Sequence, residues 1–153
     1  MRKMLLIIFT IAYLSLAGWL LFFSSAGPLH RRDGREKEMI LSPFKTTSYF
    51  LMHALETQRD REAKILLFNV GGNILLFIPL GIILYEFLGK RKMLFYLLTG
   101  FLLSLTVETL QLSIHTGTFD VDDLIWNTTG TVLGFWIWKK MREVLYAPQQ
   151  AVL

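Results

Sequence analysis

Carboxylates and amides at the edges of apolar runs are the residues of this sequence that could do chemistry. Residues 119–127 read FDVDDLIWN, with three aspartates and an asparagine directly before an apolar run, and Glu108 and Asn73 lie inside other apolar runs. Neighbouring carboxyls can work as a general acid and base or bind a divalent cation. A charge buried in hydrocarbon costs at least ~2.5 kcal/mol. The elements that carry these groups must therefore place them where water or a partner reaches them.

The composition predicts a membrane protein. Of the 153 residues, 53% are hydrophobic and 14% aromatic, and the mean hydropathy is +0.45, which is too apolar for an ordinary soluble domain. The chain has no cysteine, which excludes disulfides, thiol catalysis and thiolate metal ligands. The net charge of +4 comes from short basic clusters between apolar runs. Such clusters are typical of topology signals, so we expect no nucleic-acid partner.

Four apolar stretches approach the ~20 residues that cross a bilayer as a helix. They cover residues 5–23, 65–88, 93–112 and 124–138. The first could be a signal peptide cleaved after Ala26, but its 19 uninterrupted residues exceed the ~7 to 15 of a signal core, so we expect an uncleaved span. The last has only 15 residues, about 22 Å of helix against a ~30 Å hydrocarbon core. This shortness draws the preceding aspartates to the membrane boundary.

The sequence therefore predicts an all-α, polytopic membrane protein with four transmembrane helices and a short interfacial helix between the first and the second. Residues 43–55 are aromatic and apolar but too short to span, which favours a helix in the headgroup region. The basic clusters place both termini in the cytoplasm. The expected units are an N-terminal transmembrane helix, an extracytoplasmic loop with the interfacial helix, a three-helix core and a cytoplasmic tail, at residues 1–26, 27–64, 65–142 and 143–153.

Helix rise puts one polar group from each of three helices at one depth. Asn73, Glu108 and Asp123 each lie 16 or 17 residues from the basic cluster at the cytoplasmic end of their helix, or about 24 to 26 Å. That depth is the outer leaflet near its interface. Polar side chains in membranes turn to the bundle interior or to water, so we expect one shared polar pocket open to the outside. Gly130 and Gly134 have the spacing that permits close helix approach.

The candidate site follows from these positions. Glu108 is the candidate acid or base, because it lies a full turn inside its helix where capping does not explain it, with Asp123 and Asp120 as catalytic partners. Alternatively, Asp120 caps the fourth helix with Asp123 in capping-box position, and Asp122 is expected to face solvent. No metal site is assigned, although the carboxylates leave a divalent-metal alternative open. The candidate substrate-binding residues are Asn69, Asn73, Gln111, Asn127 and His115.

Some of these residues have simpler interpretations. Asparagines in membrane bundles often only form hydrogen bonds from helix to helix. This applies to Asn73 and Asn127 as much as substrate binding does. His115 has no second histidine at metal-site spacing, which is typical of a solvated loop residue.

Three blocks of the sequence resemble the VanZ-like membrane proteins in order, spacing and residue type. They read NVGGNILLFIPLG, SLTVETLQ and GTFDVDDLIWNTTGTVLG and begin at residues 69, 104 and 117. The resemblance covers residues 43–138 and implies a multipass protein of the bacterial cytoplasmic membrane, in a family named after a member linked to teicoplanin resistance. Many relatives have an arginine shortly before the FD pair, where this chain offers His115. The recurrent polar positions carry over to Asn73, Pro79, Glu108, Gln111, Asp120, Asp123 and Asn127.

Three functions remain open. An enzyme would use Glu108 and Asp123 on a lipid-linked or cell-wall substrate at the outer leaflet, although no serine or zinc motif accompanies them. A binding or shielding protein would hold an envelope lipid or an amphiphilic drug without turnover. A transporter would have to be a homo-oligomer, since no inverted repeat is visible. The first two rank above transport, and the expected partner is a membrane lipid or lipid-linked substrate with no cofactor.

Overall fold

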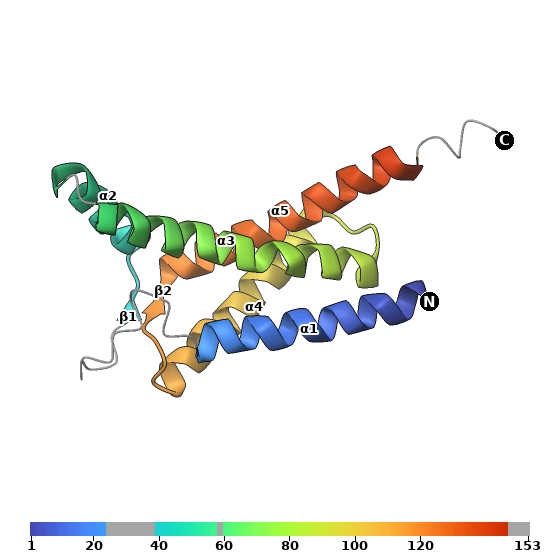
Figure 1. The fold of residues 1–153 in the computed structure, drawn as a ribbon, viewed down its shortest axis with the longest axis horizontal. Coiled ribbons are helices and arrows are strands. Elements are labelled where there is room, and N and C mark those ends of the chain that lie inside the picture. The colour runs from blue at the N-terminus through green and yellow to red at the C-terminus, as the bar shows by residue number, and fades with distance from the viewer. Residues whose placement is uncertain (24–38, 58–59, 147–153) are drawn as a thin grey trace.

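Five helices and one short strand pair make up the described part of the chain (Figure 1). The structure is a computed structural model that describes residues 1–23, 39–57 and 60–146. The predicted all-α class is confirmed, apart from two strands of two residues each. The position after Ala26 and the tail from residue 147 lie outside the described residues. The elements are α1 (Arg2–Phe22), β1 (Met39–Ile40), α2 (Lys45–Thr57), α3 (Asp60–Leu88), α4 (Met93–Ser113), β2 (Phe119–Asp120) and α5 (Val121–Tyr146).

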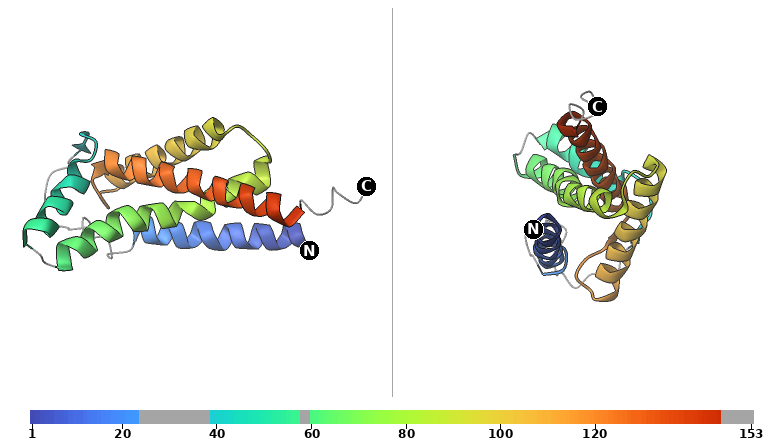
Figure 2. Two further views of the ribbon diagram at one scale, coloured as in Figure 1. Left: turned by 90° about the horizontal axis from the view of Figure 1, so that it is seen from above. Right: turned by 90° about the vertical axis from the view of Figure 1, so that its right-hand side faces the viewer.

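Helix α5 lies between α3 and α4 and packs most closely on α3 (Figures 1 and 2). The two backbones touch at three glycines. A Cβ on Gly134 would lie 2.0 Å from the carbonyl oxygen of Ile78, and one on Gly130 would lie 2.4 Å from that of Ile74. A Cβ on Gly81 would lie 2.0 Å from a carbonyl oxygen of α5. The predicted close approach at Gly130 and Gly134 is confirmed, and it brings polar side chains of both helices together.

Helix α5 differs from the other long helices in its polarity. Its 26 residues make about 39 Å of helix, enough to cross a bilayer, but Asp122, Asn127 and Thr131 are among its buried residues. Because α3 and α4 pack against it, it does not need a continuous apolar surface. The expectation of four transmembrane helices is therefore not confirmed. Among the described residues, three helices are long and apolar enough to span, at Lys3–Phe22, Arg61–Leu88 and Met93–Ser113.

Helix α1 lies at the side of the bundle, next to α3 and α4 (Figure 2). The Tyr13 hydroxyl donates a hydrogen bond to the Leu76 carbonyl oxygen of α3 at 2.9 Å. Gln111 Nε2 of α4 donates to the Leu21 carbonyl oxygen at 2.8 Å. Most large apolar side chains of α1 are exposed, which suits a helix that has lipid on most of its surface.

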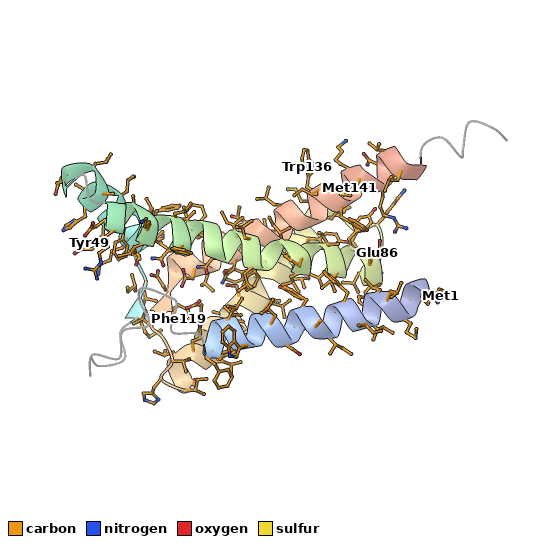
Figure 3. The ribbon with its side chains drawn as sticks, viewed as in Figure 1. Met1, Tyr49, Glu86, Phe119, Trp136 and Met141 are labelled. Atoms are coloured by element: carbon orange, nitrogen blue, oxygen red, sulfur yellow. The ribbon has the colours of Figure 1, made fainter. Side chains whose placement is uncertain are left out.

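The two ends of the bundle differ in their chemistry. Figure 3 labels Met1, Glu86 and Met141 toward one end and Tyr49 and Phe119 toward the other. The first end also carries the basic connection between α3 and α4. The N-terminal end of α1 and the C-terminal end of α5 lie there as well (Figure 1). We call the other end, where residues 119–123 lie, the acidic end.

Helix α2 runs across the bundle at the acidic end (Figure 2). A helix was predicted in this part of the chain, and its place in the headgroup region stays a prediction. Strands β1 and β2 pair in parallel beside it, with Met39 opposite Phe119 and Ile40 opposite Asp120. This pairing was not predicted, because strands of two residues have no readable periodicity. The exposed large apolar side chains of α2 are Tyr49, Leu51, Met52 and Leu55.

Candidate functional site

Three carboxyl side chains are buried at the acidic end. Glu108 of α4, Asp120 of β2 and Asp122 of α5 are 2%, 1% and 2% exposed, and Asp123 is half-buried beside them. Glu108 Oε2 accepts a hydrogen bond from the Asp120 backbone N–H at 3.2 Å. Buried carboxyls need hydrogen-bond partners, and those partners divide the four residues into two pairs with different roles.

The first pair is Asp120 and Asp122, which we call the structural pair. Asp120 caps α5 and contacts α2. Its Oδ1 accepts a hydrogen bond from the Asp122 backbone N–H at 2.9 Å, which confirms the predicted cap. Its Oδ2 accepts one from the Thr46 hydroxyl at 2.6 Å. Burial raises the pKa of the Asp120 carboxyl above its ordinary value, against the opposing effect of these two hydrogen bonds. Both oxygens are therefore engaged within the protein.

Asp122, the second residue of this pair, binds the N-terminus of α2. Its carboxylate accepts hydrogen bonds from the backbone N–H of Phe44 and, at 2.8 Å each, from the backbone N–H and hydroxyl of Thr47. Trp126 Nε1 donates to the same hydroxyl at 3.2 Å. The expectation that Asp122 faces solvent is wrong. A helix N-terminus has unpaired N–H groups, and here a carboxylate from a distant segment pairs with them.

Glu108 and Asp123 form the second pair, and each keeps one oxygen free. Asn73 Nδ2 of α3 donates to Asp123 Oδ1 at 2.5 Å, while Glu108 uses Oε2 for the Asp120 N–H. Within the described ranges, Glu108 Oε1 and Asp123 Oδ2 accept no hydrogen bond. The two carboxyls are close enough for their charges to interact. Glu108 and Asp123 therefore each have an oxygen that can contact a ligand, whereas both oxygens of Asp120 and of Asp122 already accept hydrogen bonds.

A polar layer lies one helical turn further into the bundle. Asn127 Nδ2 of α5 donates to Ser104 Oγ of α4 at 2.9 Å. The Thr131 hydroxyl donates to the backbone carbonyl oxygen of Asn127 at 3.1 Å. Asn127 is 1% exposed, yet its Oδ1 has no partner among the described residues. The other buried polar atoms without a partner there are Glu62 Oε2, Asn69 Nδ2 and Thr128 Oγ1.

The family model described as VanZ/LLP1 matches residues 9–145 of the chain. The chain belongs to this family. The VanZ/LLP1 match includes all three blocks that carried the resemblance, and with three apolar helices of spanning length it indicates a membrane protein. No curated protein matches the chain at a significant level, and no solved structure does.

The structure of this VanZ-like chain brings together most of the predicted candidates, but not all. Glu108, Asp120 and Asp123 meet directly through their hydrogen bonds and charges. Gln111 instead donates to α1. His115 is exposed after the end of α4, with a φ of 58°. The described residues include no group of three or more His, Asp or Glu arranged to hold a metal ion.

Thr46 and Thr47 were not predicted to belong to the site. They lie 74 and 75 residues before the carboxylates that they contact. Hydroxyl residues next to a helix start are a recognisable capping signal. The sequence did not indicate which carboxylate would meet them.

Replacing Asp122 with alanine is expected to release the N-terminus of α2. The change removes the acceptor of the Phe44 and Thr47 amides, and loss of a helix cap costs about 1 to 2 kcal/mol. Amide hydrogen exchange at these two positions should become roughly 5- to 30-fold faster. Ser48→Ala is the matched control, because the exposed Ser48 hydroxyl bonds only to its own helix. Unchanged protection in Asp122→Ala would show that other contacts hold α2.

Proposed function

We propose that this chain is a binding protein for the polar head of a lipid-linked or amphiphilic envelope molecule, with Glu108 and Asp123 as the residues that contact it. The observation that supports this is the free oxygen on each of these two carboxyls, in a cluster where Asp120 and Asp122 are fully engaged. Polar groups in a membrane bundle are costly and commonly mark functional sites.

The placement of the site supports a ligand from the outer leaflet. We propose that α5 crosses the membrane enclosed by α3 and α4, and that the end with the basic residues is cytoplasmic by the positive-inside rule. The acidic end then faces outward at the level of lipid headgroups. Helix α2, with its exposed Tyr49 and Leu55, would lie in the same headgroup layer.

Amphiphilic drugs are among the envelope molecules that this site would bind. Resistance to teicoplanin-type lipoglycopeptides, which the family name suggests, would follow if the site held the drug or its lipid-linked target. In either case the protein would act by binding at the outer leaflet, in the cytoplasmic membrane of a bacterium.

A second candidate function is acid–base catalysis by the same two carboxyls. The observation that favours it is the interaction between the charges of Glu108 and Asp123. Two interacting carboxyls commonly share one proton, so that one can donate while the other accepts. Such a pair could modify the ligand that it binds.

Glu108→Ala is expected to lose the bound amphiphile. Native mass spectrometry of the full chain, purified in mild detergent, should show a co-purified amphiphile on the wild type and at least about tenfold lower occupancy on the variant, the equivalent of one lost charge-assisted hydrogen bond. Asp123→Ala should behave in the same way. Glu143→Ala is the control, because Glu143 is an exposed carboxylate that forms an ion pair with Lys140 of its own helix.

The outcomes separate the two functions. Equal occupancy in wild type, Glu108→Ala and Asp123→Ala would overturn the assignment of the site. Glu108→Gln retains the size and hydrogen bonding of the side chain but does not titrate. If Glu108→Gln keeps the ligand and cells lose a phenotype that the wild type confers, catalysis replaces binding as the function.

A further inference from the structure

The hydrogen-bonding groups of the site are mostly acceptors. Its two nearest donors are already used, since the Asp120 N–H bonds to Glu108 and Asn73 Nδ2 bonds to Asp123. What remains open is Glu108 Oε1 and Asp123 Oδ2; an ionised carboxyl offers only acceptors, and a proton shared by the pair leaves at least one of these two atoms an acceptor. A ligand that fits these atoms must bring its own N–H or O–H donors.

Asn127 supplies a second, independent indication of the same kind. Its Nδ2 bonds to Ser104, so its amide lies between α4 and α5, where Glu108 and Asp123 lie one turn away on the same two helices. Its Oδ1 is buried and has no partner within the described part of the chain. A buried acceptor without a donor is costly. The polar layer next to Glu108 and Asp123 thus also contains an acceptor that lacks a donor.

The charges near the site favour a cation. Neither Glu108 nor Asp123 forms an ion pair with any basic side chain of the described residues. Lys45 acts electrostatically on Asp120, but its side chain is exposed. An anionic group would meet interacting carboxyls with no compensating charge, whereas an ammonium group with three N–H donors would satisfy acceptors on both helices.

One unpartnered donor is available for a neighbouring oxygen of the ligand. Asn69 Nδ2 is buried without a partner among the described residues, one turn from Asn73 on the same face of α3, or about 6 Å along the helix. Because Asn73 and Asp123 are only half-buried, this side of the cluster is the accessible one. A phosphate or hydroxyl oxygen close to the amine would reach Asn69.

We propose that the group recognised at Glu108, Asp123 and Asn127 is a protonated primary amine with an oxygen-bearing group beside it, as in a phosphoethanolamine headgroup carried by a membrane lipid. This inference rests on the proposed binding function. It specifies that function by chemical class: the ligand is a cationic or zwitterionic amphiphile that donates hydrogen bonds through nitrogen.

The experiment compares headgroups on identical acyl chains. The full chain, delipidated in detergent, is titrated with phosphatidylethanolamine, its N-methyl and N,N-dimethyl derivatives, phosphatidylcholine and phosphatidylglycerol, and bound lipid is counted by native mass spectrometry. Binding should weaken with each N–H replaced by a methyl group. Phosphatidylethanolamine should bind at least about tenfold more tightly than phosphatidylcholine or phosphatidylglycerol.

Isosteric variants test the residues. Glu108→Gln and Asp123→Asn should each abolish the preference for phosphatidylethanolamine over phosphatidylcholine. Gly72→Ala should keep it, because the added Cβ would contact no side chain and no other helix. The headgroup series on the wild type stands on its own if a variant does not fold.

The possible results distinguish this inference from the proposed function. Equal or tighter binding of phosphatidylcholine or phosphatidylglycerol, lost in Glu108→Ala, would overturn the amine and retain the binding site. Binding of all headgroups that no variant affects would overturn both. Competition by free phosphoethanolamine at the same concentration as the lipid would retain the amine and overturn the lipid as its carrier.

Discussion

The Gly134→Ala variant is expected to be less stable than the wild type by about 2 kcal/mol or more. Its new methyl group would lie 2.0 Å from the Ile78 carbonyl oxygen, which belongs to the backbone of α3 and has no rotamer to change. Helices α3 and α5 would have to move apart. That movement would separate Asn73 from Asp123, whose 2.5 Å hydrogen bond joins the same two helices.

The matched control is Gly72→Ala, which makes the same chemical change in α3. Apart from its chain neighbours and the backbone of its own helix turn, no atom lies within 4 Å of the Cβ that it would add. An alanine in a helix interior is favoured over glycine by up to about 1 kcal/mol, so this variant should be as stable as the wild type or more so. Thermal unfolding in detergent measures both. If Gly134→Ala unfolds at or above the wild-type temperature, the backbones of α3 and α5 do not touch at this glycine.

The stability changes expected for Gly134→Ala and Gly72→Ala have opposite signs, and this difference could be predicted from the sequence in part. The spacing of Gly130 and Gly134 predicted a close helix contact, and the contact is present. The apolar run at 93–112 likewise predicted α4 to within one residue. The start of α3 was placed five residues too late, because residues 60–64 favour a helix but are charged. Hydropathy detects the membrane-facing part of a helix and not its whole length.

The site could also be predicted in part, because the spacing of residues along a helix fixes their depth. Helix rise alone put Asn73, Glu108 and Asp123 at one depth, and the structure brings these three side chains together. The role of Asp122 could not be predicted, since its partners Phe44 and Thr47 lie more than 70 residues away in the sequence. Periodicity describes the faces of one helix. It contains no information on which distant segment meets a given carboxylate.

Asp120→Ala is expected to cost about 2 to 4 kcal/mol, since it removes two contacts at once. The cap on the Asp122 N–H contributes about 0.5 to 2 kcal/mol. Leaving the buried Thr46 hydroxyl without its acceptor costs roughly 1 to 3 kcal/mol more. Asp120→Asn is the informative control, because its amide oxygen can accept from the Asp122 N–H and its amide nitrogen can donate to the Thr46 oxygen.

The Asp120→Asn variant also serves as the reference for measuring how pH changes the stability of the wild type. Because burial raises the pKa of Asp120, the folded chain holds that proton more tightly than the unfolded chain. The contribution of Asp120 to stability is therefore greatest below its ordinary pKa of 3.8 and falls as the pH rises through the higher, folded-state value. The asparagine side chain of the variant does not titrate, so wild-type stability relative to Asp120→Asn should decline as the pH rises above 3.8. A difference that increases with pH would mean that the hydrogen bonds from Thr46 and Asp122 outweigh the burial of this carboxyl, and that the acidic end is held together by ionised Asp120. A constant difference would mean that burial and hydrogen bonding balance, so that the pKa of Asp120 is the same in the folded and the unfolded chain.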